Sequence, residues 1–126
     1  MAKKLALAIL LGWMLPSGLL ASGETKVNAI YKILLQVEWE KFQGSGNFSG
    51  SALDVTDGFI HCSYAPQLEG VRERFFKGKG PLVVLEVDAT KLGKSTVKVE
   101  ANKSGGALYP HIYGSIPLAA VTLTTL

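Results

Sequence analysis

The chain of 126 residues is poor in the residues from which redox and metal sites are usually built. Cys62 is its one cysteine, so an exported product would contain no internal disulfide and would depend on its hydrophobic core for stability. His61 and His111 are its two histidines, and they stand fifty residues apart with no repeated carboxylate spacing nearby. This spacing predicts no metal site, because zinc sites draw their ligands from closely spaced sets.

The chain also lacks a phosphate-binding glycine loop and a basic stretch suited to nucleic acid. Gly44-Ser45-Gly46 is without the third glycine and the following helix of a dinucleotide-binding loop. Thirteen Lys and Arg against ten Asp and Glu give a formal charge of +3, but no run of basic residues is interleaved with aromatics. Binding to nucleic acid by phosphate neutralisation therefore has little support. The length leaves room for one domain.

Residues 1–23 have the three parts of a secretory signal peptide. Two lysines precede an apolar run over residues 5–15, helix-breaking residues follow at 16–18, and small residues occupy 21–23. We expect cleavage after Gly23 or after one of the two small residues before it. The alternatives are an uncleaved membrane anchor, since nineteen residues before the cleavage site carry no charge, and a start placed too far upstream.

Residues 24–126 form the expected domain, with eleven basic and ten acidic side chains and a formal charge of +1. If the leader functions, the product is exported, either periplasmic or secreted. Otherwise we expect it to be membrane-anchored or cytoplasmic. Contact with a membrane is expected only through an uncleaved leader.

Hydrophobic periodicity in this domain predicts two short helices and about six strands. We expect helices at 36–42 and 67–76, a turn at 54–58, and strands at 28–35, 59–63, 82–87, 96–100 and within 112–123. The continuous aliphatic run at 82–87 is typical of a strand covered on both faces. Because strands and helices do not alternate strictly, the predicted fold class is α+β.

Both histidines stand in apolar segments, where a titratable ring has little reason to occur unless something uses it. In a strand, His61 and Ser63 share one face while Cys62 points to the other face, toward the core. His111 and Tyr113 likewise share a face. The alternative is that both are structural histidines satisfied within the core. A shared site for one small ligand requires the two rings to lie within about 12 Å of each other.

Three other residues are candidates for ligand chemistry. Glu100, at the end of an expected strand, is either a general base or ribose-hydroxyl acceptor or a solvated carboxylate. Arg72 and Arg74 are the only arginines; one of them is suited to pair a phosphate, or both lie on a solvated helix face. His61-Cys62-Ser63 also has the His-x-Ser form of two-histidine phosphoesterases, although His111-Ile112-Tyr113 lacks the second hydroxyl in the expected form.

Several motifs together resemble the family known as domain of unknown function 952, over about residues 28–124. The most specific are Gly58-Phe59-Ile60-His61 and Pro110-His111-Ile112-Tyr113-Gly114, and Tyr31 belongs to a further shared segment. The resemblance implies a fold similar to that of the ADP-ribosyltransferase superfamily, which includes RNA 2′-phosphotransferases. Such a fold has two small, splayed, mostly antiparallel sheets around a cleft that grips NAD.

The resemblance further implies that His61 and Ser63 line this cleft and hold the ribose and nicotinamide. His111 and Tyr113 would form a second wall, and Glu100 would take the acidic position. We therefore expect an enzyme that binds NAD or an ADP-ribose-type nucleotide and transfers a glycosyl or phosphate group. The expected catalytic residues are His61, His111 and Glu100, and the expected ligand-binding residues are Tyr31, Ser63, Arg74 and Tyr113. The alternatives are a two-histidine phosphoesterase-like enzyme and a non-catalytic module that binds a small ligand.

Overall fold

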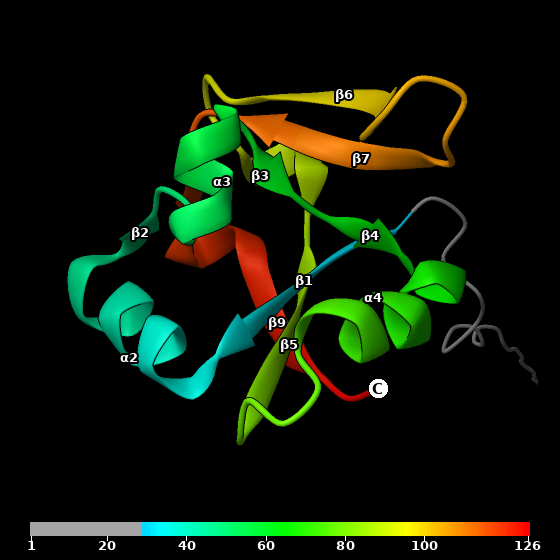
Figure 1. Ribbon diagram of the computed structural model, residues 1–126. Coiled ribbons are helices and arrows are strands. Elements are labelled where there is room, and N and C mark those ends of the chain that lie inside the picture. The colour runs from blue at the N-terminus through cyan, green and yellow to red at the C-terminus, as the bar shows by residue number, and fades with distance from the viewer. Residues whose placement is uncertain (1–28) are drawn as a thin grey trace, which may run out of the picture.

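The computed structural model describes residues 29–126 (Figure 1). The predicted leader at 1–23 and its cleavage site lie outside the described residues. Among residues 29–126, no helix is long and apolar enough to cross a membrane.

The described chain forms a small α+β domain, as predicted, with short helices and short strands. The helices are α2 (Gln36–Ser45), α3 (Ala52–Asp57) and α4 (Leu68–Phe75). The longer strands are β1 (Ile30–Leu35), β5 (Leu82–Val87), β6 (Thr96–Ala101), β7 (Leu108–Tyr113) and β9 (Val121–Thr124). The two-residue strands are β2 (Asn47–Phe48), β3 (Ile60–His61), β4 (Ser63–Tyr64) and β8 (Ile116–Pro117). Three 3₁₀ turns occupy Ala65–Gln67, Ala89–Lys91 and Leu118–Ala120.

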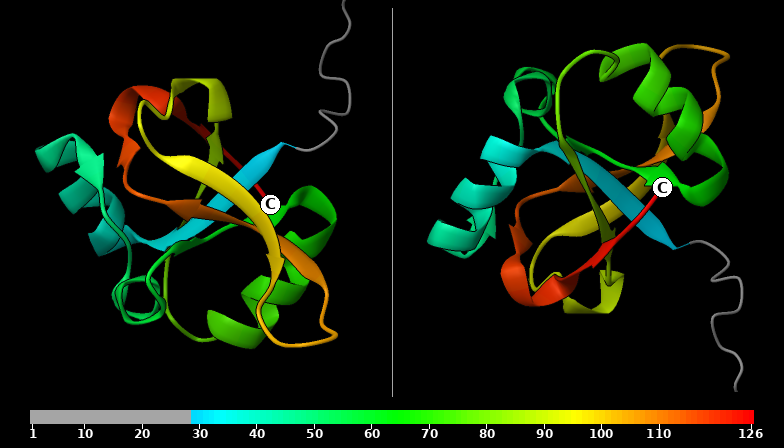
Figure 2. Two further views of the ribbon diagram at one scale, coloured as in Figure 1. Left: turned by 90° about the horizontal axis from the view of Figure 1, so that it is seen from above. Right: turned by 90° about the horizontal axis from the view of Figure 1, so that it is seen from below.

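The strands form three antiparallel sheets rather than the two expected. Their orders are β4-β1-β5-β9, β3-β7-β6 and β2-β8. Figure 1 shows the β6–β7 pair above β1 and β9, and the view from above in Figure 2 shows this pair lying across β1. The β2–β8 pair has only two residues from each strand, which is too short for alternating hydrophobicity to be recognised in a sequence. This is why the third sheet was not predicted.

Strands β1 and β5 form the centre of the domain and are covered on both faces, as predicted for β5. Leu34 and Val83 are cross-strand partners that face the main core, while the next pair, Ile33 and Val84, faces a smaller cluster beneath α4. Successive strand residues point to opposite faces, so this run must be apolar at nearly every position. The main core also contains Phe42, Ile60, Leu85, Ile112 and Ile116.

The third helix, α3, occupies a segment for which the sequence predicted a turn at 54–58. Asp54 sits at the third helical position, and its Oδ2 accepts hydrogen bonds from the Ser51 backbone N–H at 2.9 Å and the Ser51 hydroxyl at 3.0 Å. The helix ends at Gly58, whose φ of 86° is left-handed and whose N–H donates to the Asp54 carbonyl at 2.8 Å. The residues predicted to form a turn therefore belong to the end and the C-cap of a six-residue helix.

Candidate functional site

A cavity of about 520 Å³ lies between α3 and α4 and is floored by β1 and the β3–β4 segment. This volume is in the range usual for small-molecule sites. Of the residues predicted to bind or act on a ligand, Tyr31, His61, Ser63 and Arg74 line it. Tyr31 and Ser63 are cross-strand partners on β1 and β4, which explains why residues far apart in the sequence reach one wall.

The other three predicted residues, Glu100, His111 and Tyr113, are not among the described residues that line this cavity. His111 is almost completely buried, with 1 % of its surface exposed. His111 and Tyr113 therefore do not form a second wall of this cavity, and their role at a ligand stays a prediction. A two-histidine phosphoesterase needs both rings at the ligand, so that alternative loses its second histidine.

Asp54 is the most heavily bonded carboxylate of the site, with 1 % of its side chain exposed. Its Oδ2 also accepts from Lys32 Nζ at 2.9 Å, and its Oδ1 accepts from the His61 backbone N–H at 3.0 Å. Burial alone would raise the pKa of Asp54. The Lys32 ammonium and the hydrogen bonds from His61 and Lys32 outweigh burial and hold the pKa of Asp54 below its ordinary value. The carboxylate is thus ionised inside the protein.

Lys32 is the buried cation that compensates this charge. Its side chain is 7 % exposed, and besides Asp54 its ammonium donates to the His61 carbonyl at 2.8 Å. Lys32 therefore fixes His61 through both the backbone and the carboxylate partner of the ring. A buried ion pair of this kind is stable only while both partners and their additional hydrogen bonds are present.

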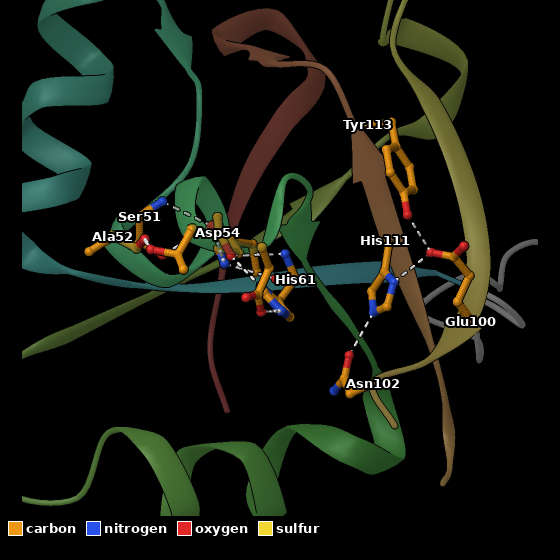
Figure 3. Close-up of polar contacts among 11 residues, drawn as sticks. Ser51, Ala52, Asp54, His61, Glu100, Asn102, His111 and Tyr113 are labelled. Carbon is orange, nitrogen blue, oxygen red and sulfur yellow. Dashed lines mark hydrogen bonds and ion pairs between the residues drawn. The ribbon is translucent and has the colours of Figure 1, made fainter. Parts of the chain in front are cut away.

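The His61 ring lies between two carboxylates, as Figure 3 shows for the Asp54 side. Nδ1 is 2.6 Å from Asp54 Oδ1, and Nε2 is 2.9 Å from Asp57 Oδ2. Both contacts are hydrogen bonds when both ring nitrogens carry a proton, as in the imidazolium ion. The side chain is 21 % exposed, so His61 is the histidine that the cavity reaches.

A second polar network surrounds His111 on β7. Its Nδ1 is 2.8 Å from Glu100 Oε1 and its Nε2 is 2.8 Å from Asn102 Oδ1, while the Tyr113 hydroxyl donates to Glu100 Oε1 at 2.7 Å. The hydrogen bonds from His111 and then Tyr113 hold the pKa of Glu100 below its usual range. The hydrogen bond that the Tyr113 hydroxyl donates to Glu100 raises the pKa of Tyr113. Glu100 thus accepts a hydrogen bond from a buried histidine while its own side chain is 38 % exposed, and it is not among the described residues that line the cavity.

The two histidine networks meet at the ring of Phe59. His61 and His111 are cross-strand partners on β3 and β7, and their ring centroids are 5.6 Å apart. The Phe59 ring lies 4.6 Å from that of His61 and 4.0 Å from that of His111, where it is stacked. The rings satisfy the 12 Å condition, yet they differ in role: His61 reaches the cavity, and His111 lies behind it.

Arg74 is the arginine that reaches the cavity. Its Nη2 donates to the Tyr109 hydroxyl at 3.0 Å, and its guanidinium lies 5.6 Å from the Phe75 ring centroid. Arg72 instead pairs with Glu69 on the same helix. Tyr109 and Phe75 also line the cavity, and the Phe75 side chain is half exposed.

Cys62 belongs to the core, as the strand alternation predicted. It is 3 % exposed, its N–H donates to the Pro110 carbonyl at 3.0 Å, and burial raises the pKa of its thiol to about 12. A thiol held protonated is a poor nucleophile, so Cys62 is unsuited to nucleophilic chemistry. Within residues 29–126, no group of three or more His, Cys, Asp or Glu side chains is arranged to hold a metal ion.

Sequence reasoning missed four residues of this site: Lys32, Asp54, Asp57 and Tyr109. One signal was present, because Ser51 followed three positions later by Asp54 has the spacing of a capping box. Nothing in the sequence tied Lys32 to this pair, since they are brought together only by the pairing of β1 with β4 and the placing of α3 beside β3.

Comparison with known proteins identifies the family. The family model described as a protein of unknown function, DUF952, matches residues 33–124. The crystal structure of protein CC0527 from Caulobacter crescentus is similar, with 42 % identity and a TM-score of 0.67 over 75 % of this chain and 82 % of that one. Its solution NMR structure matches with 42 % identity and a TM-score of 0.64, over 75 % of this chain and 79 % of that one. No curated protein matches. The chain belongs to the DUF952 family.

Proposed function

We propose that the cavity between α3 and α4 binds a small molecule of the nucleotide type, in the chemical class of NAD and ADP-ribose. The observation that carries the proposal is the separation of charge within one cavity. Arg74 and Lys79 line it from α4 and the segment that follows, whereas Asp57 and Glu38 line it from α3 and α2. A ligand that is anionic at one part and rich in hydroxyl groups at another fits such a lining.

The chemistry of the lining side chains matches the parts of a nucleotide. An arginine pairs phosphate oxygens with two parallel hydrogen bonds, and carboxylates accept from ribose hydroxyls. The aromatic side chains of Tyr31, Phe75 and Tyr109 offer surfaces on which a base can stack. NAD therefore finds suitable partners here: Arg74 for its phosphates, Asp57 or Ser63 for its ribose hydroxyls, and an aromatic wall for its rings.

His61 is the residue that we propose to act on the bound ligand. A carboxylate on Nδ1 orients an imidazole and leaves Nε2 as the nitrogen that exchanges a proton with a ligand. Asp54 has this position, and Lys32 keeps it charged. The reaction class that fits is transfer of a glycosyl or phosphate group to a hydroxyl or to water. In glycosyl transfer from NAD the nicotinamide leaves as a neutral base and His61 takes the proton of the attacking hydroxyl, whereas in phosphate transfer His61 gives a proton to the departing oxygen. In this proposal Glu100 and His111 do not contact the ligand. Glu100 orients the His111 ring, which packs against Phe59, and Phe59 in turn packs against His61.

Calorimetric titration of the purified chain with NAD, ADP-ribose and a 2′-phosphorylated nucleotide tests the proposal. We expect saturable binding of at least one of them, weakened about tenfold in Arg74→Gln, because a hydrogen bond to a charged group contributes about 1.5–3 kcal/mol. Arg72→Gln is the matched control on the same helix and keeps wild-type affinity. If none of the three ligands binds to the folded protein, the proposal is overturned.

Product analysis separates an enzyme from a binding module. We expect the bound nucleotide to be converted slowly by the wild-type chain and not by His61→Gln. Saturable binding with no product after long incubation would instead leave a non-catalytic module that binds the same ligand, and would remove the proposed role of His61 in proton transfer.

A further inference from the structure

We propose that Nε2 of His61 is the binding position for an oxyanion of the ligand, and that the Asp57 carboxylate fills this position when no ligand is bound. The ligand class, a phosphate ester or diphosphate, rests on the function proposed above. The position of the oxyanion at Nε2 does not depend on that proposed function, because it is inferred from the contacts of the His61 ring alone.

The two carboxylates on His61 are held very differently. Asp54, on Nδ1, is 1 % exposed and accepts hydrogen bonds from Lys32, Ser51 and the His61 backbone as well as the ring contact. Asp57, on Nε2, is 39 % exposed. Within residues 29–126, the ion pair with His61 is the only polar contact found for its carboxylate. One carboxylate is therefore a fixed part of the protein, and the other is exchangeable.

The position of Asp57 in α3 also favours its exchange. It is the last residue of the helix, where the unpaired carbonyls disfavour a negative charge. Gly58 follows in the left-handed conformation, so the chain reverses directly after Asp57. In the part of the chain that the structure describes, nothing in the helix holds the Asp57 carboxylate, and the His61 ring is its one polar partner.

A phosphate oxygen can replace the Asp57 carboxylate without any other change at the ring. It is also an anionic acceptor, so the Nε2–H keeps a charged partner while Asp54 stays on Nδ1. Arg74 lines the same cavity and supplies a second cation, which a phosphate can use and the Asp57 carboxylate does not. Once displaced, Asp57 remains at the cavity wall, where it can accept a hydroxyl of the ligand.

Titration with inorganic pyrophosphate tests this position without a nucleotide. We expect Asp57→Asn to bind pyrophosphate about tenfold more tightly than the wild-type chain, because the competing carboxylate is gone. Glu40→Gln, which removes an exposed carboxylate from α2, is the matched control for net charge and should leave the affinity unchanged. In NMR spectra, pyrophosphate should shift the His61 ring signals in both the wild type and Asp57→Asn.

A double substitution distinguishes two explanations for tighter pyrophosphate binding by Asp57→Asn. Either Asp57 competes with pyrophosphate for Nε2 of His61, or its negative charge simply repels the anion. If Asp57 competes for Nε2, the gain from Asp57→Asn disappears in the His61→Gln background. A gain of equal size in that background, or no gain in Asp57→Asn at all, overturns the inference. If pyrophosphate behaves as expected while NAD and ADP-ribose do not bind, the oxyanion position stands and the nucleotide proposal fails.

Discussion

Lys32 is the residue on which the order of the whole site depends. It is a lysine inside a central strand in which three of the other five residues are buried, and its ammonium donates hydrogen bonds to both Asp54 and the His61 carbonyl. From the sequence alone it reads as a charged break in an apolar strand. The reason that it was missed is physical: a buried charge is explained only by its partner, and the partner here is 22 positions away.

Lys32→Met tests this dependence, because methionine keeps most of the stem and removes the charge. We expect the free energy of unfolding to fall by about 3 kcal/mol, since removing one partner leaves a buried charge uncompensated. Urea unfolding at pH 7 measures it. Lys41→Met, at an exposed position of α2, should change stability by less than about 0.5 kcal/mol. Equal effects of the two substitutions would show that Asp54 does not need Lys32.

His61 shows that a histidine in an apolar strand can indicate a residue that faces a cavity. A histidine in an apolar strand, two positions from a serine, predicted one face directed to a ligand, and the structure places both residues at the cavity. The same reasoning predicted a ligand-facing His111, which is not among the described residues that line this cavity. His111 is satisfied on both nitrogens by Glu100 and Asn102, and the second of these lies in a loop whose return to the strand has no signature in the sequence.

At the scale of elements, the prediction was good for segments whose pattern extends over six or more residues. Strands β1 and β5 and helix α4 are close to their predicted bounds, because burial against two layers or along one helix face leaves a long periodic signal. The short helix α3 was missed and the pairing of β2 with β8 was not predicted, although β8 lies within the stretch 112–123 that was expected to contain strands. Their positions are set by caps and by pairing with distant strands, so local hydrophobicity says little about them.

The turn between β7 and β8 depends on the absence of a side chain at Gly114. Its φ is 120°, and an added Cβ would overlap the Ser95 hydroxyl and lie 2.8 Å from Ser95 Cβ. Ser95 Oγ donates to the Ser115 carbonyl at 2.7 Å, which fastens the start of β6 to this turn. The close approach of the two segments therefore requires glycine here.

Gly114→Ala should lower the melting temperature markedly, with a cost of about 2 kcal/mol or more from the strained φ and the overlap with Ser95. Gly44→Ala is the control with the opposite expectation. Gly44 lies in α2 with open space around its Cα, so alanine should stabilise the helix by up to about 1 kcal/mol. A Gly114→Ala protein as stable as the wild type would mean that the turn rearranges at little cost.

At the scale of the whole molecule, stability should fall in acid because of Asp54. Its pKa is lowered in the folded chain relative to the ordinary value of an aspartate, about 3.9, so its ionised form stabilises the fold above about that pH. As the pH falls below the unfolded value toward the folded one, the unfolded state takes up a proton first. The stabilisation is then progressively lost.

Urea unfolding of the wild type and Asp54→Asn between pH 7 and pH 3 measures this contribution. The wild-type curve should decline steeply in the acid part of the range, and the curve of Asp54→Asn should be flatter, so that the two converge. Parallel curves would show that other carboxylates account for the acid sensitivity.

The fold class was predictable from the whole chain, and the arrangement of its sheets was not. Many short strands with few helices, out of strict alternation, indicated α+β. The split into three sheets depends on which strands pair, and β3 and β4, separated only by Cys62, pair with different partners in two different sheets. That division places His61 on one sheet and Ser63 on another, and the cavity opens where the two separate.

Helix α3 is fastened to the rest of the domain in an unusual way. Asp54 is its one buried residue, while the apolar side chains of Leu53 and Val55 are exposed. The carboxylate that docks the helix is therefore the same group that orients the His61 ring. Thermodynamic linkage makes this relation reciprocal: a change in the partners of the His61 ring changes how tightly α3 is docked, and a displacement of α3 changes how firmly the ring is held. A change of partner at one nitrogen of the His61 ring therefore alters the free energy with which a wall of the cavity is held in place.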